Sequence, residues 1–225
     1  MIGTVVNTSA IVMGSIIGVS AGRLINDSLK QILMQALGLA VVVIGIDMAL
    51  SVKNLIPSVA CLLLGALTGE LMKIERGVEL LGQKLKNRFS SGSSTFVQGF
   101  VTATILYLSG PMMVIGCLQD GTIGNPDTLY LKSLLDGVAS IAISSTLGIG
   151  VAFSAASVLV VQGSLTLLAS YLTFLQEPAV LSAITATGGM IILGIGTNLL
   201  GITIIRVGNL IPSLVYAAVY PVIFL

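Results

Sequence analysis

The chain has 225 residues and a formal net charge of +1 at pH 7; 55% of its residues are hydrophobic and only 8% are charged. A soluble surface needs far more charge, so this composition argues against a soluble enzyme. Nucleic-acid binding is also disfavoured, because the net charge is small and no basic run is interleaved with aromatic residues.

The hydrophobic residues occur in blocks close to the length of about 20 residues that crosses a hydrocarbon core. Hydropathy windows of that size predict eight spans. They cover residues 2–21, 32–51, 54–72, 95–118, 131–153, 156–175, 180–203 and 209–225. The sequence therefore predicts an all-α, polytopic transmembrane helical bundle that forms one integral membrane domain over residues 1–225. The sixth span could instead be a re-entrant hairpin.

Orientation follows from Lys and Arg, which are retained on the cytoplasmic side during insertion. Five basic residues follow the third span: Lys73, Arg76, Lys84, Lys86 and Arg88. If this segment is cytoplasmic and all eight spans cross, Arg23, Lys30 and Arg206 are also inside, and only Lys53 and Lys132 are outside. Without the sixth span, Arg206 would move to the outer side.

Residues 73–94, between the third and fourth spans, form a polar linker. Apolar residues recur in it at helical spacing among charged ones: Ile74, Val78, Leu81 and Leu85. This pattern predicts an amphipathic cytoplasmic helix at the membrane interface. It could bind anionic lipids or a partner protein, although topology alone requires a basic linker on this side.

An internal repeat is the most informative pattern. The segment NLIPS at residues 54–58 recurs at residues 209–213. Upstream, residues 38–47 align without gaps on residues 189–198, and Gly14-Ser15 falls on Gly163-Ser164 at nearly the same offset. The first three spans, within residues 1–72, therefore correspond to the last three, within residues 156–225, with residues 95–153 between them.

The offset between the copies is five spans, an odd number, so the copies have opposite orientations. Inverted repeats of this kind are typical of secondary transporters, and they also occur in channels. Coincidence among Gly- and Ile-rich helices is the alternative explanation. If the sixth span does not cross, the repeat becomes parallel.

Several short segments together resemble a known family. They are MIGTVVNT at residues 1–8, MQALGLA at 34–40, GPM at 110–112, QDG at 119–121, KS at 132–133, DG at 136–137, FSA at 153–155 and QG at 162–163. In combination they resemble the YqgA/YdfK-like bacterial membrane proteins (domain of unknown function 554) over essentially the whole chain. The resemblance implies a multi-pass protein of the bacterial inner membrane, and it brings no established substrate or functional residues.

Polar residues inside spans are the first places to look for a site, because lipid cannot satisfy them. Asp47 lies near the end of the second span, where it could bind a cation or carry a proton. Alternatively, it reaches the interface or pairs with Lys53. Its repeat partner Asn198 could add a neutral oxygen to the same site.

The fourth span contains Ser109-Gly110-Pro111 near its middle. Proline removes a backbone donor and clashes with the preceding turn, so a kink or a broken helix is expected here. Broken helices commonly form transporter sites, although proline kinks are also ordinary in membrane helices. Gln98 is a nearby candidate ligand.

Asn7 in the first span and Gln162 in the sixth are amide side chains at helix depth, where burial is costly, and both are candidate ligands. Lys132 and Asp136 have the spacing of a helical ion pair near the outer interface, for which a structural role is expected.

No catalytic motif, metal site or cofactor site is predicted. The chain has no His, and its two cysteines, Cys61 and Cys117, lie in separate apolar segments without metal-ligand or disulfide spacing. An ATP-binding loop is also missing from the sequence. The chain is therefore not expected to be an enzyme.

The leading hypothesis is a secondary or ion-coupled carrier for a small solute or ion, embedded in the lipid bilayer. Alternatives are a channel-like pore, or a non-transporting scaffold or sensor that recruits a partner through its cytoplasmic helix. Glycines spaced for close helix contact, such as Gly14 and Gly18, fit a compact bundle that could also form a homo-oligomer.

Overall fold

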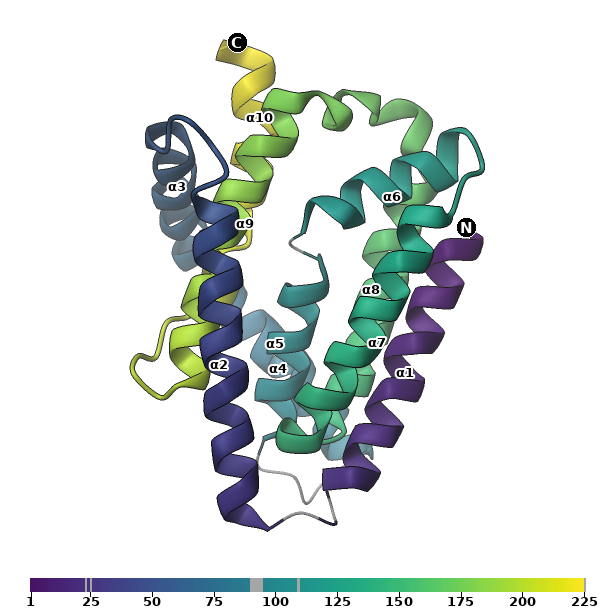
Figure 1. Ribbon diagram of the computed structural model, residues 1–225. Coiled ribbons are helices and arrows are strands. Elements are labelled where there is room, and N and C mark those ends of the chain that lie inside the picture. Colours follow the sequence, from purple (N-terminus) through teal and green to yellow (C-terminus); the bar gives the residue numbers. More distant parts are fainter. Residues whose placement is uncertain (23, 25, 90–94, 109, 225) are drawn as a thin grey trace. The chain divides into compact units, whose positions relative to one another are not determined.

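A computed structural model describes residues 1–22, 24, 26–89, 95–108 and 110–224. These residues form ten α-helices and three short 3-10 turns (Figure 1). The helices pack as two units, each assembled from segments that are distant in the sequence. Each predicted three-span copy contributes one helix to the first unit and two helices to the second.

The first unit contains α1 (Ile2–Gly22), α5 (Phe96–Leu108), α6 (Pro111–Thr122), α7 (Asp127–Leu147) and α8 (Gly150–Leu167), and ends with the turn η1 (Ala169–Tyr171). Helices α1 and α7 run parallel, because Gly3 lies against Leu129 and Gly14 against the backbone of Gly137. Helix α8 runs antiparallel to α1.

The second unit contains α2 (Asp27–Ala49) from Gln35 onward, α3 (Ile56–Met72), η2 (Thr173–Gln176), α9 (Pro178–Leu199), η3 (Val207–Leu210) and α10 (Pro212–Phe224). Glycines let these helices approach closely. Gly38 faces Gly196 and Gly45 faces Gly189, so α2 and α9 are antiparallel. Helices α3 and α10 are antiparallel as well, since Gly65 lies against Ser213 and Gly69 against Asn209.

The predicted amphipathic helix is present as α4 (Ile74–Phe89), and residues 90–94 of the predicted linker lie outside the described residues. Helix α3 ends at Met72, the capping residue Lys73 has a left-handed φ of 54°, and α4 starts at Ile74. The backbone N–H of Glu75 donates to Asn209 Oδ1 at 2.7 Å. The start of α4 is therefore held to the second copy of the repeated NLIPS segment.

Five helices of the described chain are long and apolar enough to cross a membrane, or six if α5 and α6 form one bent span. The five are α1, α2, α8, α9 and the segment Val207–Phe224. Helix α3 is a shorter apolar helix of 17 residues. Helix α7 has 21 residues and contains Asp127, Lys132 and Asp136. A helical bundle with several apolar spans is therefore established, and the number eight stays a prediction.

The predicted limits of the fifth and sixth spans, 131–153 and 156–175, are wrong. Helix α7 already begins at Asp127, and the break before α8 falls at Gly148. Gly148 has φ 80° and ψ −161°, a conformation that side chains disfavour, so this glycine sets the boundary. Lys132 consequently lies one turn inside α7 and not at the very start of the span.

The predicted break in the fourth span is confirmed. Helix α5 ends at Leu108, α6 begins at Pro111, and the two helices are bent by 62° (Figure 1). Proline fits the first position of a helix, where its missing N–H would have no partner, but it disrupts a continuing helix.

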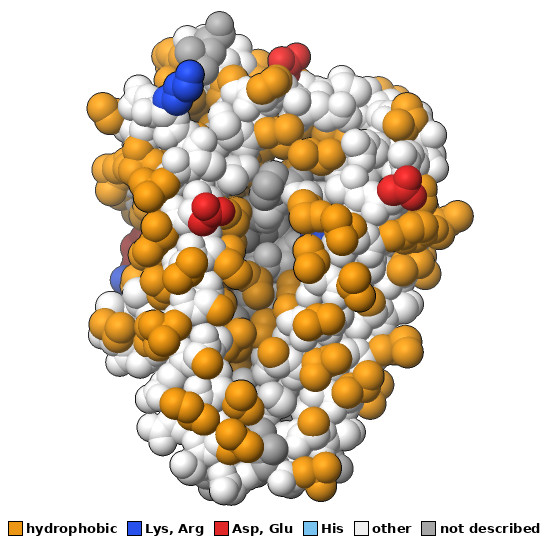
Figure 2. All heavy atoms as spheres, in the orientation of Figure 1, with side chains coloured by type: hydrophobic (Ala, Val, Ile, Leu, Met, Phe, Trp, Pro, Cys, Tyr) orange, Lys and Arg blue, Asp and Glu red, His pale blue; other side chains and the backbone are white. Residues whose placement is uncertain are grey.

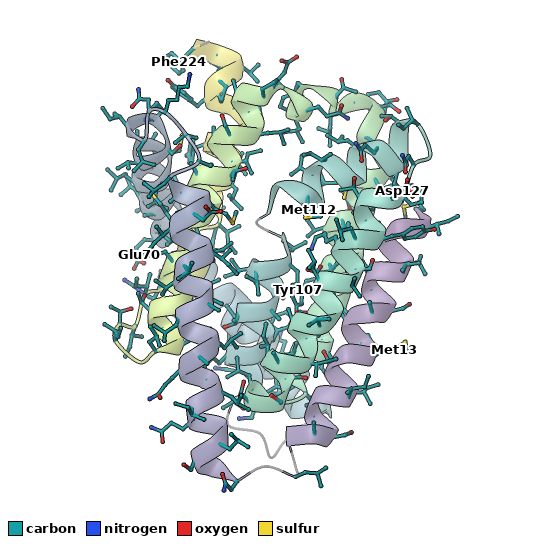
Figure 3. All side chains as sticks on the ribbon, viewed as in Figure 1. Met13, Glu70, Tyr107, Met112, Asp127 and Phe224 are labelled. Atoms are coloured by element: carbon teal, nitrogen blue, oxygen red, sulfur yellow. The ribbon has the colours of Figure 1, made fainter. Side chains whose placement is uncertain are left out.

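Exposed and buried residues in the first unit show the pattern of a protein in lipid. Ile2, Met13 and Ile16 of α1 are exposed, and Met13 extends from α1 away from α7 and α8 (Figure 3), whereas Asn7 and Ser15 of the same helix are fully buried. Hydrophobic side chains also cover much of the face shown in Figure 2, where few charged groups are visible. Such a surface suits a hydrocarbon solvent.

Candidate functional site: a buried polar cluster

An ion pair is buried in the middle of α7. Lys132 Nζ donates a hydrogen bond to Asp136 Oδ2 one turn along the helix. The two residues are only 5% and 8% exposed. Asp136 is nine residues from the first residue of α7, which corresponds to about 14 Å along a helix. Ionisable residues buried inside a membrane protein are costly and usually mark a functional site.

Amide side chains from two other helices complete the site. Asn7 Nδ2 of α1 donates to Asp136 Oδ2 at 3.0 Å and to Gln162 Oε1 of α8 at 2.9 Å. Gln162 Nε2 in turn lies 3.3 Å from Thr4 Oγ1. Neither Asn7 nor Gln162 is exposed. We call Thr4, Asn7, Lys132, Asp136, Gln162 and Thr166 the buried polar cluster.

Hydroxyl groups extend the cluster on both sides. Thr4 Oγ1 and Thr166 Oγ1 are 3.3 Å apart, and Thr166 also donates to the Gln162 carbonyl at 2.9 Å. On α5, Tyr107 shares a 2.8 Å hydrogen bond with Ser140, and its ring centroid lies 5.8 Å from Lys132 Nζ. This distance suits a cation–π contact.

The cluster has one acceptor that its neighbours do not use. Within the described part of the chain, Asn7 Oδ1 is buried and has no hydrogen-bond partner. An unpaired polar atom is costly in a low-dielectric interior. The cluster thus combines a carboxylate with several oxygen atoms and the ammonium group of Lys132, a set that can exchange a proton or accept a small cation beside Asp136.

Two of the predicted ligands, Asn7 and Gln162, meet in this cluster, and the predicted Lys132–Asp136 ion pair is confirmed. Both residues lie within α7, whereas the expectation placed them at the start of the span; the position of the pair near the outer interface stays a prediction. Lys132 and Asp136 lowered the hydropathy at the start of α7, which moved the predicted start of the span from Asp127 to residue 131. The turn residues Asn125-Pro126, which directly precede the helix, were the available signal for its true start.

The proposed combination of Asp47 and Asn198 is not formed. Asp47 is exposed on α2. Because α2 and α9 are antiparallel and Gly45 faces Gly189, the level of Asp47 is near Gly189. Asn198 is nine residues farther along α9, which is about 14 Å of helix. Aligned positions near the ends of two antiparallel helices lie at opposite ends of the helix pair.

The remaining candidates lie outside the cluster. Gln98 is exposed on α5, Gly110 lies half-buried between α5 and α6, and Pro111 begins α6. Ser109 is outside the described residues. No observation tests ligand binding at the break. Among the described residues, no group of three or more Cys, Asp or Glu side chains is arranged to hold a metal ion.

The side-chain amide of Asn198 forms hydrogen bonds within the loop that follows it. Nδ2 donates to the Ile205 carbonyl at 2.7 Å, and Oδ1 accepts from the Ile205 N–H at 2.8 Å and from Thr203 Oγ1 at 3.1 Å. These bonds close the loop that follows α9. The contacts of Asn198 are therefore those of a loop-forming residue.

We expect Asn198→Ala to increase the rate of tryptic cleavage after Arg206 in the detergent-solubilised protein. Loss of two backbone hydrogen bonds at about 1 kcal/mol each should raise the population of the open loop roughly tenfold or more. Thr185→Val is the control, because Thr185 bonds only to Leu181 of its own helix. An unchanged cleavage rate in Asn198→Ala would contradict this role.

Buried polar side chains surrounded by apolar, exposed helix faces define the chain as a helical membrane protein. It belongs to the family described as "Protein of unknown function (DUF554)", which matches residues 2–222. The family named on sequence resemblance is thereby confirmed.

Two curated relatives cover almost the whole chain. The "Uncharacterized membrane protein YdfK" of Bacillus subtilis (strain 168) is 35% identical over 221 residues, which span 95% of this chain and 93% of the relative. The "Uncharacterized protein YqgA" of Escherichia coli (strain K12) is 29% identical over 222 residues, or 96% and 94% of the two chains. No solved structure matches the chain.

Proposed function

We propose that this protein is a multi-pass transport protein of the bacterial inner membrane, a secondary carrier that couples movement of a small solute to a proton or cation at Asp136. The observation that carries the proposal is the buried Lys132–Asp136 pair, held by Asn7 in the middle of three packed helices. A purely structural protein gains little from such a pair, because apolar residues of similar size are often equally stable.

The cluster supplies a mechanism for coupling. Asp136 Oδ2 accepts from both Lys132 and Asn7, so neutralising the carboxylate by a proton or a cation removes the ion pair and releases Lys132. Asn7 Oδ1 is an acceptor close to the same carboxylate. Lys132 would therefore have two arrangements, one bonded to ionised Asp136 and one released from neutral Asp136. A coupled carrier requires a two-state element of this kind.

Helix directions support eight crossings. In the first unit, α1 and α7 are parallel and α8 is antiparallel to both, as expected for the first, fifth and sixth spans. In the second unit, Arg206 Nη1 bonds Glu70 Oε1 at 2.8 Å. Glu70 lies near the cytoplasmic end of α3, the side on which the eight-span topology places Arg206.

Contacts between α2 and α9 support the inverted repeat. The alignment equates Gly38 with Gly189 and Gly45 with Gly196. The contacts join the other pairs, Gly38 with Gly196 and Gly45 with Gly189. If a two-fold axis relates the two copies, a residue of one copy contacts the residue that is equivalent to its own partner. The crossed pairing of these glycines is therefore the pattern that such an axis produces. Such pairs of inverted copies underlie alternating access in secondary transporters.

The test is electrogenic or pH-coupled flux in proteoliposomes on a solid-supported membrane. The purified protein receives concentration jumps of Na⁺, K⁺, H⁺, phosphate, single amino acids and dicarboxylates, together with compounds that accumulate in a deletion strain. We expect a transient, saturable current with at least one compound. We expect Asp136→Asn to abolish that current and Asp127→Asn, an exposed carboxylate on the same helix, to retain it.

A current that does not saturate with concentration would favour a channel. Equal currents from wild type and Asp136→Asn would show that Asp136 is not the coupling group. Absence of current with every compound, from protein that remains folded in the vesicles, would favour the non-transporting scaffold or sensor.

A further inference from the structure

A second candidate site lies in the second unit and shares no residue with the buried polar cluster. It is a cavity of about 410 Å³ between the start of α3, the start of α9 and the end of α10. The lining residues are Ser51, Val52, Lys53, Asn54, Pro57, Ser58, Ala179, Ser182, Ala183, Tyr220 and Pro221. We call it the α3–α9 cavity.

The charge of this cavity is positive. Among the described residues that line it, Lys53 is the only charged one. The first turn of α3 lines it through Pro57 and Ser58, and the first two turns of α9 line it through Ala179 and Ser182. Helix N-termini carry unpaired N–H groups and a partial positive charge, so the two helix starts and Lys53 act in the same direction.

Ser58 provides an independent indication of a ligand. It is only 2% exposed and it lines the cavity. Among the described residues its hydroxyl has no hydrogen-bond partner. Its counterpart in the second copy, Ser213, is fully buried and donates to the Leu210 carbonyl. The serine hydroxyl of the repeated segment therefore has a hydrogen-bond partner within its own helix start in the second copy, whereas in the first copy it is available to a ligand.

The two copies of NLIPS differ in the same way at their asparagine. Asn209 bonds Glu70 at 2.6 Å and the backbone of Glu75 at 2.7 Å. Within the described part of the chain, the Asn54 side chain accepts one hydrogen bond, from the Ile56 N–H at 3.1 Å, and this exposed side chain lines the cavity. One copy of the segment thus joins helices, while the other presents a hydroxyl and an amide beside Lys53.

We propose that the α3–α9 cavity binds an oxyanion, a phosphate or carboxylate group, with Lys53 as the counter-ion and Ser58 and the two helix starts as hydrogen-bond donors. The group comes either from a small free anion or from the head group of an anionic lipid. The binding site stands whether or not the protein transports a solute, because it uses none of the residues of the buried polar cluster.

The test is equilibrium dialysis of the full-length protein in zwitterionic detergent against radiolabelled inorganic phosphate, with acetate as competitor. A parallel arm uses native mass spectrometry after exchange into vesicles of phosphatidylcholine with and without phosphatidylglycerol. Lys53→Gln should weaken binding about tenfold and Ser58→Ala about fivefold, since these changes remove one charge and one donor. Lys84→Gln and Ser213→Ala are the matched controls.

Phosphate binding that the two cavity variants weaken assigns the site to a free anion. Retention of phosphatidylglycerol without phosphate binding, again weakened by both variants, assigns it to a lipid head group. The proposal is overturned if neither probe binds, or if Lys53→Gln and Ser58→Ala bind as tightly as their controls. Thermal unfolding of each variant distinguishes loss of the site from loss of the fold.

Discussion

Asp136→Leu is expected to lower the free energy of unfolding by about 3–5 kcal/mol, because it leaves the charge of Lys132 buried without its partner. Asn7 loses an acceptor in the same substitution. The double variant Lys132→Met/Asp136→Leu should recover stability to within about 1–2 kcal/mol of wild type, since a buried ion pair is readily replaced by apolar residues of similar volume. Chemical unfolding in detergent micelles measures both.

Transport should not recover with stability. The double variant keeps the fold and removes the group that we assign to coupling, so its proteoliposomes should give no current. The exposed pair between Arg206 and Glu70 is the matched control. Arg206→Gln should cost less than about 1 kcal/mol, as is usual for ion pairs in contact with water. A double variant that is folded and fully active would exclude Lys132 and Asp136 from the mechanism.

Gly14→Ala is expected to destabilise the first unit strongly. A Cβ atom on Gly14 would lie 2.3 Å from the carbonyl oxygen of Gly137, so α1 and α7 would have to separate. Overpacking of this kind typically costs about 1–3 kcal/mol, and more where backbone must move. Separation of the two helices would also disturb the bond from Asn7 to Asp136. We therefore expect a lower thermal midpoint and reduced flux.

The control for Gly14→Ala is the same substitution at the aligned glycine of the second repeat copy. Gly163 aligns with Gly14, but a Cβ on Gly163 would have only ordinary contacts, the nearest at 3.7 Å from the end of Met1. Gly163→Ala should be neutral or stabilise α8 by up to about 1 kcal/mol through helix propensity. Similar losses in both variants would show that small side chains at these positions matter for a reason other than the α1–α7 contact.

Local patterns were sufficient for the class of protein and for several elements. Apolar runs of spanning length predict helices in lipid wherever they occur, and proline at position 111 interrupts a helix in any context, so the break between α5 and α6 was predictable. The amphipathic spacing of α4 is likewise a local property. Burial cost alone identified Asn7 and Gln162 as the better candidates among the neutral polar residues.

The sequence by itself determined a helical membrane protein of this family, with a polar linker after the third span and a repeated segment. Only the tertiary structure decided that Asn7, Asp136 and Gln162, which are up to 155 positions apart, meet at one point, and that Asp47 and Asn198 do not. Periodicity specifies which residues share a face of one helix. It does not specify which helices become neighbours or whether they run parallel, and both depend on the close contacts that glycines allow between distant segments.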